Sequence, residues 1–381
     1  MSKIRRNNIV LLILIGLTAA CHSKKESVSV LSVNNSPLIV CDEAKVTETR
    51  EVKLSELVDD VEIIYLDNRD EAFFKFQSMA ISDHYMCIWQ RDGGAAKLFD
   101  RTGKYLCDVG SVGQGPGEYR AVYDVLIDEK AGCVYVASFI GEFIYKYDLN
   151  GTFIKKIDFE ETVNKPRMYL ESDGSLSLVH LCFKDRGSQF SAANIFGPGD
   201  SIKYVYVEEL TTNFKDKEGK KVGADQEIWS YRNENDFPFM LTSTDTLYHY
   251  SSVRNEINAH FTVKMDPEKK GDAFFIFNEL PNHFLVFIVG EKGKTILINK
   301  ESHEAYNVKL VNDQMGGMDV FPRFQDGYFF NIYEPQVLKD KIDEFIQSGS
   351  LSEDKKLELE SLQSTLQENN NNVVLLGKLK K

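Results

Sequence analysis

Four polar side chains beside a glycine-rich stretch are the best candidates for chemistry in this sequence. Residues 110–119 read GSVGQGPGEY, and an arginine follows directly. We predict that Gln114, Glu118, Tyr119 and Arg120 form a polar cluster that faces a ligand. The alternative is that Glu118 and Tyr119 hydrogen bond to amides of the loop and pack against the neighbouring structural unit.

Signatures of known catalytic sites are missing from the sequence. It contains no HExxH, GxSxG, Walker or EF-hand pattern. The glycine-rich stretch lacks the Lys-Ser/Thr pair of a phosphate loop and does not open a helix. We therefore assign no catalytic residue, and the sequence leaves the cofactor unknown.

The seven histidines occur singly, so their spacing predicts no metal site. They are His22, His84, His180, His249, His260, His283 and His303. A lone histidine in a strand or turn is usually structural. Separate strands can nevertheless bring distant histidines together, and the metal question therefore stays open.

The glycine-rich stretch also indicates what surrounds it. Glycine is entropically costly inside helices and strands, and Pro116 has no N–H to donate. The stretch is thus expected to be a tight connection between two β units. The 25 phenylalanines and 17 tyrosines of the 381-residue chain favour strands over helices.

Two hairpin sequences repeat 48 residues apart. FDRTGKYL at residues 99–106 and YDLNGTFI at 147–154 share an aromatic-Asp-x-x-Gly pattern. Aspartate and glycine suit hairpin turns because both tolerate positive φ. A fainter copy starts at Ile298.

A second series consists of six polar turns, each followed by an apolar or aromatic run. These turns are Asp83-His84, Lys130-Ala131, Asp173-Gly174, Asp245-Thr246, Asn282-His283 and Asp326-Gly327. Intervals near 40–50 residues are typical of propeller blades, one four-stranded sheet per copy. We predict an all-β, six-bladed β-propeller over residues 46–381.

Three further segments complete the predicted architecture. Residues 208–238 are expected to be a loop insertion, in which Trp229 and Tyr231 either stack on a sugar ring or anchor the loop. Residues 336–368 are expected to form a short helical hairpin, with a capping box at residues 350–353. The last apolar run, residues 373–379, is expected to share a blade with residues 61–66.

The chain resembles the six-bladed β-propeller lipoproteins of Bacteroidetes, which are similar in shape to NHL-repeat propellers. The residues that carry the resemblance are Leu66, the two hairpins, GQGPGEY at 113–119 and NVVLLGKL at 372–379. Val373 stands where that family typically has proline. The resemblance implies a fold and a compartment, and no general activity.

The N-terminus predicts secretion and lipid attachment. Basic residues precede an apolar run that is too short to span a bilayer, and LTAAC at residues 17–21 resembles a lipobox. We expect residues 1–20 to be a lipoprotein signal peptide and Cys21 to be lipidated; the alternative is plain signal cleavage. Residues 21–45 are expected to be a tether and N-terminal extension.

The net charge limits the kinds of partner, and the cysteine content predicts the state of the thiols. The net charge of −13 argues against nucleic acid. The five remaining cysteines are expected to be buried free thiols, with a single disulfide as the alternative.

We predict a lipid-anchored module of the cell envelope that binds a glycan, a peptide or an envelope protein. The alternative is a propeller hydrolase or lyase, with or without the assistance of a metal ion.

Overall fold

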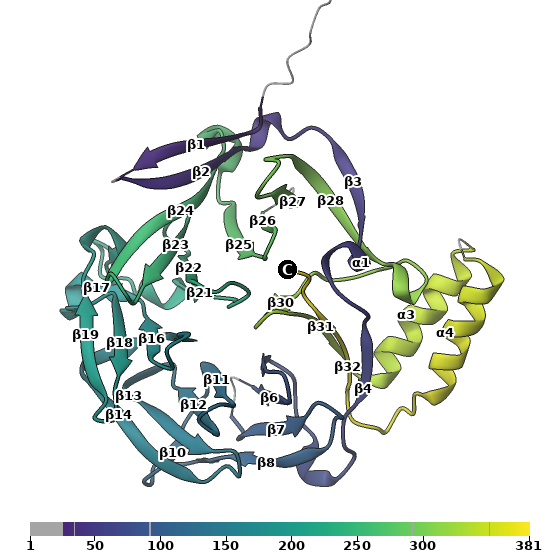
Figure 1. Cartoon of the computed structure of the whole chain (residues 1–381), viewed down its shortest axis with the longest axis horizontal. Helices are drawn as coiled ribbons and strands as arrows, with labels where there is room; N and C mark the ends of the chain where they lie inside the picture. The colour runs from purple at the N-terminus through teal and green to yellow at the C-terminus, as the bar shows by residue number, and fades with distance from the viewer. Residues whose placement is uncertain (1–25, 34, 91–92, 291–292, 350) are drawn as a thin grey trace, which may run out of the picture.

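The computed structural model describes residues 26–33, 35–90, 93–290, 293–349 and 351–381. Within them, six sheets, each with four antiparallel main strands, stand in a ring like the blades of a propeller (Figure 1). The predicted six-bladed, all-β fold is confirmed. The expected signal peptide and the lipidation site Cys21 lie outside the described residues.

Each blade has four main strands, which follow one another from the centre of the ring outwards. Blade 1 contains β30 (Phe324–Gln325), β31 (Tyr328–Tyr333), β32 (Val373–Lys378) and β4 (Glu62–Tyr65). Blade 2 contains β5 (Ser78–Ile81), β6 (Tyr85–Trp89), β7 (Ala96–Asp100) and β8 (Tyr105–Val109). Blade 3 contains β11 (Asp124–Asp128), β12 (Cys133–Ala137), β13 (Ile140–Asp148) and β14 (Phe153–Asn164).

The other three blades follow the same plan. Blade 4 contains β15 (Arg167–Leu170), β16 (Leu176–Val179), β18 (Ala192–Phe196) and β19 (Ser201–Val205). Blade 5 contains β21 (Ile228–Trp229), β22 (Phe237–Leu241), β23 (Thr246–Ser251) and β24 (Glu256–Lys264), extended by β2 (Ser36–Asp42) and β1 (Val28–Val33). Blade 6 contains β25 (Phe274–Glu279), β26 (His283–Val289), β27 (Lys294–Asn299) and β28 (Ala305–Asn312), flanked by β3 (Thr49–Lys53) and β29 (Met318–Asp319).

Short elements connect the blades. The pairs β9 (Ser111–Val112) with β10 (Glu118–Tyr119) and β17 (Cys182–Phe183) with β20 (Thr211–Thr212) are parallel. The α-helices are α1 (Leu54–Leu57), α2 (Pro267–Lys270), α3 (Pro335–Gln347) and α4 (Glu353–Thr365). Single 3₁₀ turns lie at η1 (Glu43–Lys45), η2 (Asp70–Ala72), η3 (Lys184–Arg186), η4 (Glu208–Leu210), η5 (Gly223–Asp225) and η6 (Asp313–Met315).

The two repeated hairpins form as their sequences predict. In each, the aspartate Oδ1 accepts hydrogen bonds from two backbone amides of the turn, at 2.8–3.1 Å for Asp100 and 2.8–2.9 Å for Asp148. The glycines of the turns, Gly103 and Gly151, have φ of +89° and +78°. A side chain at either position would meet a backbone carbonyl of the neighbouring segment at 2.2 or 2.0 Å, so only glycine fits.

Five of the six predicted turns join the first and second strands of a blade, and the sixth does not. Asp245-Thr246 joins β22 to β23, the second and third strands of blade 5. The first strand of that blade, β21, lies inside residues 208–238, where the sequence suggested only a loop insertion. The signal was weak because β21 has two residues and the polar turn after it is long.

The ring closes as expected from the two ends of the sequence. Strand β32 pairs with β31 on one side and with β4 on the other, with Val374 opposite Ile64. A C-terminal strand thus joins one from the start of the chain. This closure gives both strands hydrogen-bonding partners that an open ring would lack.

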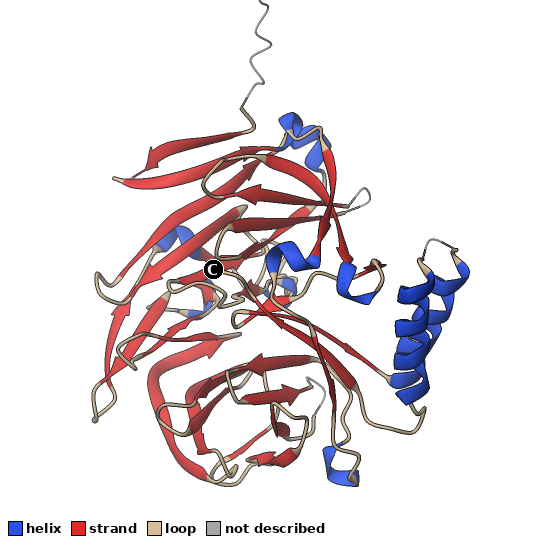
Figure 2. Ribbon diagram, turned by 45° about the vertical axis from the view of Figure 1, so that its right-hand side comes forward, coloured by secondary structure: helices blue, strands red, loops and turns tan. Residues whose placement is uncertain are grey.

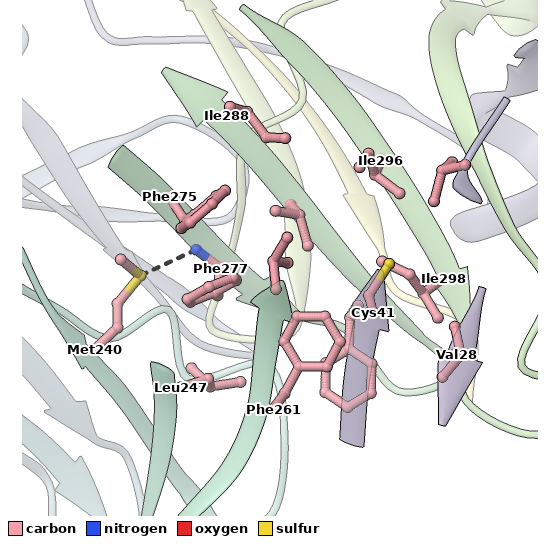
Figure 3. Close-up of a cluster of buried hydrophobic side chains, with 14 residues drawn as sticks. Val28, Cys41, Met240, Leu247, Phe261, Phe275, Phe277, Ile288, Ile296 and Ile298 are labelled. Carbon is pink, nitrogen blue, oxygen red and sulfur yellow. Dashed lines mark hydrogen bonds between the residues drawn. The ribbon is translucent and has the colours of Figure 1, made fainter. Parts of the chain in front are cut away.

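The junction of blades 5 and 6 holds one of the buried cores (Figure 3). Phe261 of β24 stacks on Phe284 of β26 with ring centroids 4.3 Å apart. Val28 and Cys41 of the β1–β2 hairpin belong to the same core. Strands β1 and β2, which lie in the range expected to be a tether and N-terminal extension, therefore extend blade 5, because their apolar side chains pack in this core.

The helical hairpin packs on the outside of blade 1 (Figures 1 and 2). Leu338, Ile342 and Leu359 are buried together with Val373 and Leu375 of β32. The N-cap of α4 is Ser352, whose side chain accepts from the amide of Lys355, two residues later than the expected capping box. None of the helices in the described ranges has the length and apolarity needed to cross a bilayer. All five cysteines from Cys41 onward are free thiols.

Candidate functional site

The predicted polar cluster is divided between a surface hollow and the core. Gln114, Glu118 and Arg120 line a hollow of about 540 Å³ beside blade 3. Tyr119 is only 1% exposed. Its hydroxyl donates to the carbonyl of Val109 at 2.5 Å and accepts from the amide of Ala96 at 2.9 Å. Tyr119 therefore joins blade 2 to the loop and faces no ligand.

The side chain of Glu118 is used within the loop. Its Oε2 accepts from the amide of Gly115 at 2.8 Å, while its backbone carbonyl accepts from the hydroxyl of Tyr145 at 2.6 Å. A Cβ on Gly113 would lie 1.9 Å from Oε2 of Glu118, and one on Gly117, where φ is +74°, would lie 2.4 Å from the ring of Phe153. For Glu118 and Tyr119 these contacts match the structural alternative.

A buried ion cluster crosses the centre of the ring. Nη1 of Arg232 lies 3.0 and 2.9 Å from the two carboxylate oxygens of Asp124, and Nε lies 2.6 Å from Oδ1 of Asp326. All three side chains are nearly inaccessible to solvent. Burial raises the pKa of Asp326, although the charge of Arg232 opposes the rise.

This cluster links five blades, and the residue after Arg232 adds the sixth. Besides Arg232, the carboxylate of Asp124 accepts from the amide of Met168 in blade 4, and that of Asp326 accepts from the amide of Ile81 in blade 2. The next residue, Asn233, donates to Asn278 of blade 6 at 2.7 Å. Arg232 and Asp326 have φ of +55°, a conformation rare for residues with side chains. The network therefore stabilises the ring, and all of its charged groups are paired.

A second arginine near the centre has no carboxylate partner. Arg323 lines a pocket of about 510 Å³ at the end of blade 6 that carries the β26–β27 turn. In the described part of the chain, its guanidinium forms no ion pair; it lies 5.7 Å from the ring centroid of Phe76 and 5.1 Å from that of Phe321. The residue remains accessible to solvent, but partial desolvation by its neighbours lowers the pKa of Arg323.

The walls of this pocket are aromatic with a few amides. Its lining includes Phe76, Gln77, Tyr231, Asn278, Phe287, Phe321 and Gln325. Tyr231 is one of the two aromatic residues noted in the sequence for stacking on a sugar. The other, Trp229, stacks on Phe274 at 6.3 Å between the blades, and is a packing residue.

Six titratable groups meet at the opposite end of blade 6, next to the β25–β26 and β27–β28 turns. Glu279 accepts from Nε2 of His249 at 2.6 Å, and its other oxygen lies 3.3 Å from Nε2 of His260 and 2.9 Å from Nζ of Lys300. Nδ1 of His249 faces Asp236 at 3.4 Å, and Glu234 accepts from Lys300 at 2.7 Å.

The surroundings shift the pKa values of this cluster strongly. Burial opposes the charge of His249, but its hydrogen bonds to Asp236 and Glu279 outweigh burial and raise its pKa to about 9. Burial likewise opposes the charge of Glu279, but hydrogen bonds from His249 and His260 hold its pKa well below its usual range. Convergent groups with perturbed pKa values mark candidate sites for binding or catalysis.

The sequence analysis singled out neither Arg323 nor the group formed by His249, His260 and Glu279. His249 and His260 are separated by ten residues, and Glu279 lies on the next blade. The bulge of β24 between the partners of Leu247 and Tyr248 places His260 beside His249, with ring centroids 3.9 Å apart. A bulge at that position has no clear sequence signal.

Three solved structures are similar to this chain to different degrees. A protein from Bacteroides fragilis, provisionally described as exported, aligns with a TM-score of 0.62 at 14% identity, covering 90% of this chain and 100% of that one. A DUF4221 family member from Bacteroides vulgatus aligns with a TM-score of 0.44 at 10% identity, covering 85% and 97%. Virginiamycin B lyase from Staphylococcus aureus aligns with a TM-score of 0.43 at 9% identity, covering 84% and 99%. At 14% identity the likeness to the first structure concerns the fold alone.

Comparison with protein families gives a direct assignment. No curated protein matches the chain. The model of the family described as a domain of unknown function, DUF4934, matches residues 37–378, which include every blade of the propeller. The chain belongs to the DUF4934 family.

Proposed function

We propose that this protein is a lipid-anchored binding module of the cell envelope that captures an acidic glycan in the pocket around Arg323. The observation that carries the proposal is the guanidinium of Arg323, which is within reach of solvent and has aromatic neighbours but, among the described residues, no carboxylate partner. The guanidinium is exposed, and a ligand carboxylate that reaches it would form a charge-assisted, bidentate hydrogen-bonded pair.

The lining of the pocket favours a sugar acid over other anions. Aromatic faces such as those of Phe76, Tyr231 and Phe321 suit the apolar faces of sugar rings, and the exposed amide of Gln77 suits hydroxyl groups. The other cation of the pocket, Lys294, already pairs with Glu43, so Arg323 supplies the uncompensated charge.

The location rests on the N-terminal sequence. The lipobox-like residues 17–21 support export followed by acylation of Cys21. Cys21→Ala should shift the protein from the detergent phase to the aqueous phase in a partitioning assay. Equal partitioning of both forms into the aqueous phase would rule out the anchor.

The binding experiment compares acidic and neutral sugars of equal length. Calorimetric titration of the purified chain with an oligogalacturonate should show binding, and a neutral malto-oligosaccharide should show none. Arg323→Gln should weaken binding about ten-fold or more, because a hydrogen bond to a charged group contributes about 1.5–3 kcal/mol.

The matched control is Arg254→Gln. Arg254 is exposed, pairs with Glu256 and lies outside the pocket lining, so this variant makes the same charge change without an effect on binding. Unchanged binding by Arg323→Gln would overturn the proposal. Preference for a short peptide with a free C-terminal carboxylate would overturn the glycan assignment.

A hydrolase or lyase is the second candidate, and the cluster around Glu279 favours it through its shifted pKa values. Incubation of the oligogalacturonate with the protein separates the two functions. A pure binding module leaves the chain length of the sugar unchanged, whereas an enzyme produces shorter fragments.

A further inference from the structure

We propose that His249, His260 and Glu279 form a binding site for a divalent transition-metal ion such as Zn²⁺. The inference concerns the end of blade 6 opposite the Arg323 pocket and does not rest on the proposed glycan binding. The ligand atoms of the three side chains all lie within 4.8 Å of one another. Two imidazoles and one carboxylate form a ligand set that suits zinc and related ions.

The distances fit an ion after small side-chain movements. Neighbouring ligand atoms around tetrahedral zinc are about 3.3 Å apart, given bonds of about 2.0–2.1 Å. The two Nε2 atoms already lie 2.6 and 3.3 Å from oxygens of Glu279. Lys300 and His260 both lie near Oε1 of Glu279, whereas His249 lies near Oε2. Oε2 is therefore the oxygen available to an ion.

The groups around the three ligands would orient them. Asp236 lies 3.4 Å from Nδ1 of His249 and would hold the proton of the neutral ring on that nitrogen, which leaves Nε2 free to bind a metal. Metal-bound histidines usually have such a carboxylate partner. Lys300, which is itself held by Glu234 at 2.7 Å, fixes the other oxygen of Glu279.

The charge of the cluster also suits a divalent ion. Binding of the ion displaces the proton that Asp236 and Glu279 favour on His249. With both imidazoles then neutral, the carboxylates of Glu234, Asp236 and Glu279 outnumber the single ammonium of Lys300 by two negative charges. A divalent cation neutralises this excess. The side chains of His249 and His260 are 16% and 28% exposed, so an ion can reach them from solvent.

The test is a titration of untagged, chelator-treated protein with Zn²⁺, followed by calorimetry, and with Co²⁺, followed by its visible absorption. We expect saturation at one ion per chain. His260→Asn should weaken the affinity at least ten-fold. Asp236→Asn should weaken it about 10–100-fold through the orientation of His249.

The control is His84→Asn. His84 is an exposed histidine in blade 2 that also contacts a carboxylate, Glu129 at 2.8 Å, and this variant should keep the affinity of the unmodified chain. Circular dichroism of each variant excludes unfolding as the cause of any loss. His260 and Asp236 are the chosen positions because both are accessible to solvent, which makes folding defects small.

Three results would overturn the proposal. One is the lack of saturable binding by the unmodified chain. Another is equal affinity of His260→Asn and His84→Asn. The third is a preference for Mg²⁺ or Ca²⁺, since these ions take oxygen ligands and would not use the two imidazoles.

Discussion

Two arginines near the centre of this propeller have opposite environments. Arg232 is buried against Asp124 and Asp326, whereas Arg323 lies among aromatic rings, within reach of solvent, with no carboxylate partner in the described chain. The first, with its two carboxylate partners, links five blades. The second is the arginine that we propose binds a ligand. The two arginines therefore differ both in the partners of their charge and in their access to solvent.

The largest expected effect comes from breaking the paired arginine. Arg232→Met should lower the free energy of unfolding by about 3–5 kcal/mol, because two buried carboxylates lose their counter-ion. Urea denaturation measures the loss. A variant that also carries Asp124→Asn and Asp326→Asn should recover part of the stability. A loss below about 1 kcal/mol for Arg232→Met alone would contradict the assigned role, since a broken buried ion pair costs more than that.

The buried side chain of His180 extends the comparison, because its two hydrogen bonds require a neutral imidazole ring. Nε2 of His180 donates to the carbonyl of Phe190 at 2.8 Å, and Nδ1 accepts from the amide of Asn164 at 3.3 Å. Burial lowers the pKa of His180 to about 4, against about 6.5 in an unfolded chain.

The sign of the pH dependence follows from these values. Between about pH 6.5 and pH 4 the unfolded chain binds a proton that the folded chain does not, so stability falls as the pH falls. The contribution is on the order of 3 kcal/mol. Urea melts across this window should show a shallower decline for His180→Gln than for the unmodified chain. Equal slopes would show that His180 titrates normally in the fold.

Loss of an uncharged, fully hydrogen-bonded group should lower stability by a smaller amount. Tyr119→Phe removes the hydroxyl that accepts from the amide of Ala96 and donates to the carbonyl of Val109. The buried amide and carbonyl are then left unpaired. We expect a loss of about 1–3 kcal/mol in thermal or urea unfolding. Tyr65→Phe is the control, because Tyr65 is exposed and should change stability little. A loss as small for Tyr119→Phe would contradict the structural role assigned to its hydroxyl.

The smallest effect is expected at the unpaired arginine. Arg323→Gln should change the free energy of unfolding by less than about 1 kcal/mol, because the substitution breaks no ion pair and removes only contacts with aromatic rings. The same urea denaturation as for Arg232→Met gives a direct comparison. A loss of several kcal/mol would show that Arg323, like Arg232, is structural.

Much of the fold could be predicted from the sequence, and the reason is that its signals are local. The turn chemistry of Asp100-x-x-Gly103 and Asp148-x-x-Gly151 specifies hairpins within a few residues. The apolar run at the C-terminus predicted closure with the first strand, as β32 and β4 show. The prediction was incomplete in blade 5, where β21 is too short to produce a pattern of its own.

The candidate sites depended on the tertiary structure. Arg232 meets Asp124 across 108 residues and Asp326 across 94, and these pairs exist only once the ring has closed. The isolation of Arg323 is likewise a property of the assembled pocket.

The sequence by itself determined the strands, the turns and the closure of the ring, because hydrophobic alternation and turn residues act over short distances along the chain. Only the tertiary structure decided which charges are paired, which remain available and which histidines meet. Electrostatic interactions depend on distances in space and on burial, and both are set by the packing of blades far apart in sequence.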